Sequence, residues 1–100
     1  ENLIINIKKK TIFYEKDGEM VEILFKKKFD FSVFLYFMRN YESIINMSNL
    51  LNATCSEPEY TKDSLVEASI SSIRKTFLNL FDINPIKAFK KVGYRFSLGV

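Results

Sequence analysis

The sequence predicts an α+β domain in which a small antiparallel sheet precedes three helices and a C-terminal β-hairpin. Three observations lead to this prediction. Short runs of β-branched and aromatic residues fill the first quarter of the chain, apolar residues recur every three or four positions in the middle, and two further short runs follow Pro85. Because 100 residues suit one core, we expect a single domain over 1–100, with the sheet at 1–25, the helices at 29–80 and the hairpin at 86–98.

The first quarter of the chain predicts three strands. Residues 3–7 and 11–14 are rich in isoleucine and aromatic side chains, which favour an extended backbone. Lys16-Asp17-Gly18 indicates a tight turn, because glycine tolerates the positive φ that short hairpins need. Residues 20–25 are therefore expected to return as the third strand.

The middle of the chain predicts two helices separated by a brief strand. Asp30 is a favourable acidic residue at a helix start. The apolar side chains that follow share one helical face, at Phe31, Phe34, Leu35 and Met38. Residues 44–45 are sufficient only for a brief strand, and Asn46 is a good N-cap for a second, short helix that reaches Ala53.

A third helix is expected from Asp63 or Ser64, either of which can cap it, to about residue 78. Its apolar residues share one face, at Val66, Ile70, Ile73 and Phe77. The opposite face is small and polar and ends in a cation, with Ser64, Ala68, Ser71, Ser72 and Lys75. We therefore expect the apolar stripe to pack inward and the serine-rich face to lie in solvent.

Two short strands complete the expected layout. Asn84-Pro85 ends the helical region, and residues 86–90 and 94–98 predict strands joined through Lys91-Val92-Gly93. Two helices joined by a loop and followed by a β-hairpin form a winged helix-turn-helix, here with an N-terminal antiparallel sheet. In that layout the third helix enters the major groove of DNA, and the hairpin, or wing, lies over the backbone or the minor groove.

Composition excludes several other classes of function. The chain has no histidine and no visible nucleophile motif, paired carboxylates or glycine-rich phosphate loop. The single Cys55 has no partner for an internal disulfide or a thiol metal site. We expect it to be a small buried hydrophobe, with a redox-sensing thiol as the alternative. The sequence thus predicts no enzyme, no metal, no cofactor and no small-molecule substrate.

Charge is distributed unevenly along the chain, although the formal net charge is only +3. From residue 86 to the end there is no acid, and the cations are Lys87, Lys90, Lys91 and Arg95. Such a basic tip attracts a phosphate backbone. The lysine triplets at 8–10 and 26–28 fall at expected strand ends, where charges commonly serve solubility.

Four segments resemble the OmpR/PhoB-type winged helix of bacterial response regulators, and they keep that family's order and spacing. They are Asp30-Phe31-Ser32-Val33-Phe34-Leu35, Asn46-Met47-Ser48-Asn49-Leu50-Leu51, Val66-Glu67-Ala68-Ser69-Ile70-Ser71-Ser72-Ile73-Arg74-Lys75 and Val92-Gly93-Tyr94-Arg95-Phe96. The third segment and the wing are most similar to the ToxR/CadC-like branch. Members of that branch commonly carry this domain ahead of a transmembrane segment.

The resemblance implies sequence-specific binding of double-stranded DNA and regulation of transcription, with the recognition helix at about 63–78 and the wing at 86–98. It places DNA contacts at Ser64, Ala68, Ser69, Ser71, Ser72, Arg74, Lys75, Lys90, Lys91 and Tyr94. Each has a structural alternative. Arg74 can pair with Glu67, the serines and lysines can be solvated, and Tyr94 can stabilise the wing.

Partners beyond DNA are also implied by the resemblance. Glu57 and Glu59 belong to an acidic loop that touches RNA polymerase in relatives, and a solvated loop is an equal alternative. Two copies on a repeated or tandem site are expected, as a homodimer or with a related regulator. We expect a cytoplasmic domain, and a tether to the inner membrane stays open. The alternative function is a protein-interaction module with weak DNA binding, which the serine-rich helix favours, as does Cys55 at a position where relatives carry tryptophan.

Overall fold

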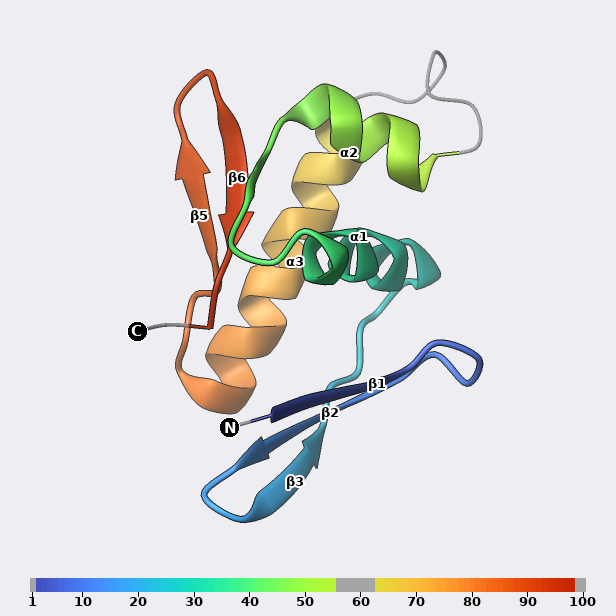
Figure 1. Cartoon of the computed structure of the whole chain (residues 1–100), viewed down its shortest axis with the longest axis vertical. Helices are drawn as coiled ribbons and strands as arrows, with labels where there is room; N and C mark the ends of the chain where they lie inside the picture. Colours follow the sequence, from blue (N-terminus) through green and yellow to red (C-terminus); the bar gives the residue numbers. More distant parts are fainter. Residues whose placement is uncertain (1, 56–62, 99–100) are drawn as a thin grey trace.

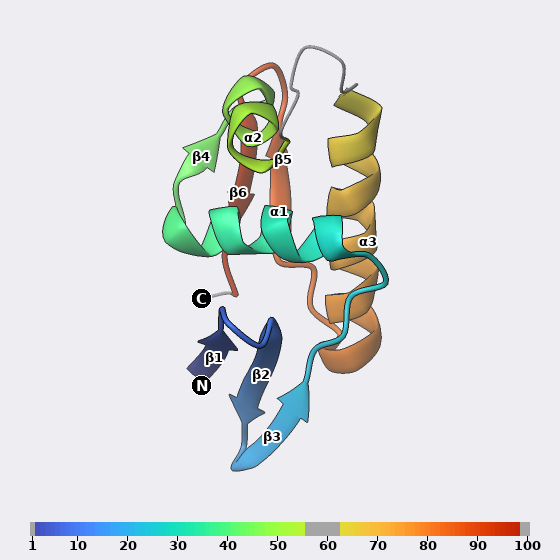
Figure 2. The same cartoon turned by 90° about the vertical axis from the view of Figure 1, so that its right-hand side faces the viewer.

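The computed structural model describes residues 2–55 and 63–98, and its architecture is the α+β arrangement that the sequence predicts (Figure 1). The elements are β1 (Asn2–Asn6), β2 (Thr11–Lys16), β3 (Glu19–Glu22), α1 (Lys28–Arg39), β4 (Ile44–Ile45), α2 (Met47–Thr54), α3 (Asp63–Phe81), β5 (Ile86–Phe89) and β6 (Gly93–Phe96). The strands form two antiparallel sheets, in the orders β1-β2-β3 and β4-β6-β5. Helix α1 crosses α3 between the two sheets (Figure 2).

The turn between β2 and β3 sets the pairing of these two strands of the amino-terminal sheet. Lys16 pairs with Glu19, so the loop between β2 and β3 has two residues. Both of them, Asp17 and Gly18, have a positive φ, of 54° and 80°, which is the backbone of a type I′ hairpin. The predicted turn is therefore confirmed, and β3 ends at Glu22, three residues earlier than expected.

Helix α1 starts two residues before the expected position. It begins at Lys28, with Lys27 as an extended N-cap that makes no side-chain cap hydrogen bond within the described residues. Asp30 therefore lies inside the first turn and is not the cap. Its carboxylate still lies at the positive end of the helix dipole, but it is buried, and its partners come from another helix.

Local capping explains the limits of the other two helices. The Asn46 side chain accepts a hydrogen bond from the backbone N–H of Asn49 at 2.8 Å, so the predicted cap of α2 is confirmed. Helix α3 continues to Phe81, three residues beyond expectation. Asp82 then adopts a left-handed φ of 58°, and its N–H donates to the carbonyl of Leu78 at 2.9 Å.

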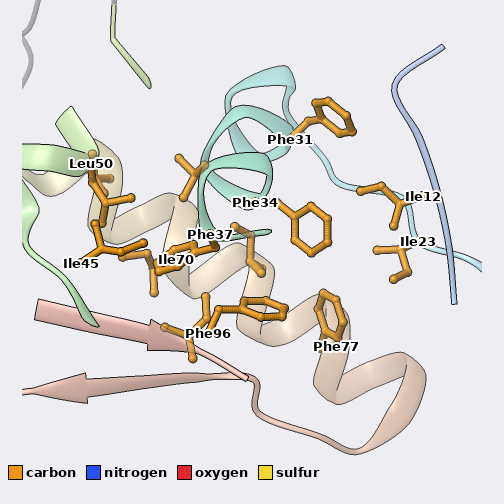
Figure 3. Close-up of a cluster of buried hydrophobic side chains, with 14 of the residues drawn as sticks. Ile12, Ile23, Phe31, Phe34, Phe37, Ile45, Leu50, Ile70, Phe77 and Phe96 are labelled. Carbon is orange, nitrogen blue, oxygen red and sulfur yellow. The ribbon is translucent and has the colours of Figure 1, made fainter. Parts of the chain in front are cut away.

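A phenylalanine-rich core joins the helices to both sheets (Figure 3). The ring of Phe96, on β6, lies 5.6 Å from Phe34, 6.0 Å from Phe37 and 5.6 Å from Phe77, measured between centroids. All four side chains are fully buried, and burial of each contributes roughly 1.5–3 kcal/mol. This cluster anchors the wing against α1 and α3.

One glycine permits the close approach of β4 and β6. Gly93 has a φ of 154°, and a Cβ at this position would lie 2.1 Å from the carbonyl oxygen of Ile45. No residue with a Cβ fits at this position unless the backbone of β4 moves. Because β4 leads into α2, Gly93 also fixes where α2 begins relative to the wing.

Candidate nucleic-acid interface

One face of α3 is exposed to solvent from its first turn to Lys75. Ser64, Ala68, Ser71 and Lys75 are all exposed, and they succeed one another at intervals of four, three and four residues, which places them on one face. We call these four residues the α3 stripe. In Figure 2 the upper part of α3 is uncovered on this side, and the linker between β3 and α1 passes beside the helix lower down. The predicted solvent-facing side is therefore confirmed for these four residues.

Two serines that were expected on or beside that open face turn inward instead. Ser69 is only 3% exposed, and its hydroxyl donates to Oδ1 of Asp30 at 2.7 Å. Ser72 is half-buried and donates to Oδ2 of the same carboxylate at 2.9 Å. Asp30 itself is 1% exposed. Ser69, which the resemblance places among the DNA contacts, is therefore buried, and Ser72, expected on the open face, is only partly exposed, because α1 places a buried carboxylate beside this edge of α3.

Arg74 connects α3 to the wing. Its side chain is half-buried, and Nε donates to the backbone carbonyl of Ile86 at 3.1 Å. The alternative of an ion pair with Glu67 is not found between these two described residues. Within the described part of the chain the two terminal nitrogens of the guanidinium have no hydrogen-bond partner, so four N–H donors remain for an external acceptor.

The wing places cations at its tip. Lys90 and Lys91 are exposed in the turn between β5 and β6, and Lys91 has a left-handed φ of 63°. Tyr94 is half-buried on the wing face that looks toward α2 and α3. A hollow of about 500 Å³ separates these elements, and we call it the wing-side hollow; it is lined by residues 46–48, Asp63, Glu67 and 88–94.

The other face of the wing is also basic. Lys87 and Arg95 lie directly opposite each other on β5 and β6. Both cations lie over the ring of Phe89, at 5.5 Å and 5.2 Å from its centroid. The aromatic face offsets part of the repulsion between the two like charges, so Phe89 stabilises a basic hairpin.

A second, larger hollow lies along the opposite side of the α3 stripe. Its volume is about 660 Å³, and we call it the α1-side hollow. Its lining includes Lys26, Lys27, Phe29 and Asp30 near the start of α1, and Leu65, Ala68, Ser69, Ser71, Ser72, Lys75, Thr76 and Asn79 on α3. From the sequence, Lys26 and Lys27 are expected only to aid solubility. No local sequence pattern indicates that the linker between β3 and α1 passes beside α3.

The remaining predicted residues add nothing to this surface. Glu57 and Glu59 lie outside the described residues. Cys55 is half-buried at the end of α2, where its Sγ lies 3.7 Å from the hydroxyl of Thr54. Among the described residues no cluster of acids and cysteine could hold a metal ion, and no helix is both long and apolar enough to span a membrane.

Sequence comparison identifies one family. Residues 22–96 match the family described as "Transcriptional regulatory protein, C terminal". That span includes all three helices and both strands of the wing. Comparison with curated proteins gave no match.

Structural comparison finds the same fold in several solved domains. The DNA-binding domain of the response regulator AdeR, solved with an intercistronic region, superimposes with a TM-score of 0.80 at 14% identity, covering 97% of this chain and 95% of that one. The RstA domain of Klebsiella pneumoniae, solved with the RstA box, gives 0.73 at 20% identity, with coverages of 97% and 92%. The DNA-binding domain of E. coli CadC gives 0.74 at 14% identity, with coverages of 97% and 87%.

Proposed function

Because this chain belongs to the family of C-terminal domains of transcriptional regulatory proteins, we propose a specific way in which it binds DNA. Its function is sequence-specific binding of double-stranded DNA in the regulation of transcription. In the proposed complex the α3 stripe enters the major groove, while the wing lies over the adjacent backbone or the minor groove. The AdeR and RstA domains, which share the fold, were solved with DNA.

The α3 stripe is the observation that carries this proposal. An α-helix with its side chains is about 10–12 Å across, and the major groove is about 12 Å wide. The exposed side chains of Ser64, Ala68 and Ser71 are short, so the helix backbone can approach the base edges closely. Hydroxyl groups can bond either base edges or phosphates, and the alanine methyl can contact thymine.

Phosphate contacts are proposed for Lys75, at the end of the stripe, and for groups on its wing side. The terminal nitrogens of Arg74 suit a phosphate because a guanidinium can donate two parallel hydrogen bonds. Lys75, Lys90 and Lys91 are exposed cations, and the hydroxyl of Tyr94 is a further donor. Ser69 is left out of the proposed contacts, since its hydroxyl is buried against Asp30.

Sequence discrimination by one copy should be modest. The stripe offers no arginine or asparagine that could read a base with two hydrogen bonds. We therefore propose that two copies bind a repeated or tandem site, as a homodimer or with a related regulator. DNA shape then contributes to the choice of site.

The salt dependence of binding tests the proposal. Fluorescence anisotropy of a labelled 30-base-pair duplex should give a plot of log affinity against log salt with a slope of about −4 to −5, as expected for roughly four to six neutralised phosphates. Arg74→Ala and Lys90→Ala should weaken binding to all duplexes alike. Absence of duplex binding even at low salt would contradict the proposal.

A protein-interaction module is the second candidate function. It is favoured by the serine-rich stripe, which lacks the long side chains of strong base readers. The partner would be RNA polymerase or another regulator, bound through the segment that holds Glu57 and Glu59. Pull-down of polymerase subunits that is lost on Glu57→Lys/Glu59→Lys, together with negligible DNA affinity, would favour this candidate over the first.

We propose a cytoplasmic location, since a bacterium keeps its DNA there, with a tether to the inner membrane as the finer alternative. The likeness to the CadC domain motivates that alternative. Fractionation of cells that express the full-length protein separates the two, because a tethered regulator sediments with the membranes.

A further inference from the structure

The α1-side hollow carries more positive charge than the wing-side hollow. Its charged lining consists of Lys26, Lys27 and Lys75 against Asp30, whose carboxylate is buried and bonded to two serine hydroxyls. In the wing-side hollow the two lysines of the wing tip face Asp63 and Glu67. An anion is therefore attracted more strongly to the hollow beside α1.

The lysines at the start of α1 are unfavourable for the helix itself. Lys26 and Lys27 precede the helix and Lys28 begins it, so three cations lie at the positive end of the helix dipole. Lys27 is also the N-cap, a position where serine or aspartate would accept a backbone hydrogen bond and lysine cannot. The local fold gains nothing from these charges, and all three side chains are exposed.

The α3 stripe borders the α1-side hollow, which Ala68, Ser71 and Lys75 help to line, and the wing-side hollow lies toward the side of α3 that carries Asp63 and Glu67. In Figure 1 the wing lies on one side of α3 and the amino-terminal end of α1 on the other. A helix that fills the major groove has one phosphate backbone along each of its sides. With the wing on the first backbone, the second backbone runs along the hollow that Lys26 and Lys27 line.

We propose that Lys26 and Lys27, together with Lys75, bind the phosphate backbone on the side of the major groove opposite the wing. This inference rests on the proposed function and extends it. The footprint then covers both walls of the groove, and a segment preceding the first helix becomes part of the DNA-binding surface. The lysines act as point charges and read no sequence.

A charge-neutralising double variant tests the inference. Lys26→Gln/Lys27→Gln is compared with the control Lys16→Gln/Arg39→Gln, which removes the same charge at positions that line neither hollow. Loss of two phosphate contacts should make the slope of log affinity against log salt shallower by about 1.8. Raising the salt from 50 to 200 mM lowers the affinity for a 30-base-pair mixed-sequence duplex in both proteins. The factor by which affinity falls should be about 12 times smaller for the double variant than for the unaltered chain.

The outcomes separate this inference from the function on which it rests. A shallower slope for Lys26→Gln/Lys27→Gln alone, with recovery in Lys26→Arg/Lys27→Arg and no loss of thermal stability in either variant, supports it. If the unaltered chain binds duplex and both glutamine variants have the same slope, the inference is wrong and the proposed function stands. If the unaltered chain binds no duplex, both are wrong.

Discussion

Removal of the Ser69 hydroxyl should destabilise the domain although the side chain is small. Ser69 donates to Oδ1 of Asp30 at 2.7 Å, and the two residues are 3% and 1% exposed. A hydrogen bond to a charged group contributes about 1.5–3 kcal/mol, and water cannot easily replace this donor. We expect Ser69→Ala to lower the free energy of unfolding by about 2 kcal/mol, and Ser72→Ala by about 1 kcal/mol because Ser72 is only half-buried.

A double-mutant cycle isolates the interaction between the two residues. In an Asp30→Ala background the Ser69 hydroxyl has lost its acceptor and is buried, so Ser69→Ala should be neutral or slightly stabilising. Ser71→Ala, on the exposed stripe, is the matched control and should change stability by less than about 0.5 kcal/mol.

Urea denaturation followed by circular dichroism measures these differences. With a slope of about 1–2 kcal/mol per molar urea for a domain of this size, the midpoint of Ser69→Ala should fall by about 1–2 M. Equal midpoints for Ser69→Ala and Ser71→Ala would show that the Ser69–Asp30 hydrogen bond does not stabilise the fold. An equal loss of stability on Ser69→Ala in the Asp30→Ala background and in the unaltered chain would show the same.

Three further substitutions test other parts of the account. Lys91→Gly should raise stability by about 1 kcal/mol, because the left-handed φ of 63° strains a side chain, while duplex affinity falls; melting and anisotropy check the two effects. Gly93→Ala should cost about 3 kcal/mol or more, because its Cβ would lie 2.1 Å from the Ile45 carbonyl oxygen; a melting temperature near that of the unaltered chain would contradict this. Lys27→Ser should stabilise α1 by roughly 1 kcal/mol through a better N-cap yet weaken duplex binding, and a parallel rise in both would contradict the assigned role.

The sequence predicts best the features that depend on neighbouring residues. The Asp17-Gly18 turn and the Asn46 cap are set by one or two side chains acting on their own backbone. The apolar stripe of α3 is set by helical periodicity, and so is the exposed stripe opposite to it. These features predict the order of the elements and most of the core.

The sequence predicts poorly what depends on the packing of distant segments. Ser69 lies at the edge of its helix, and it turns inward only because α1 places a carboxylate 39 residues earlier in the chain beside it. The position of Lys26 and Lys27 beside α3 likewise depends on the path of the linker after β3. No local pattern encodes either contact, so both had to come from the structure.

In the proposed complex, duplex DNA lies along the α3 stripe, between the wing and the start of α1. Titration of the ¹⁵N-labelled chain with a short duplex, followed by amide chemical shifts, tests it most directly. The largest shifts should fall at residues 64–75 and 89–94, with further shifts at 26–27. Largest shifts on β1 to β3, with residues 64–75 unchanged, would contradict it.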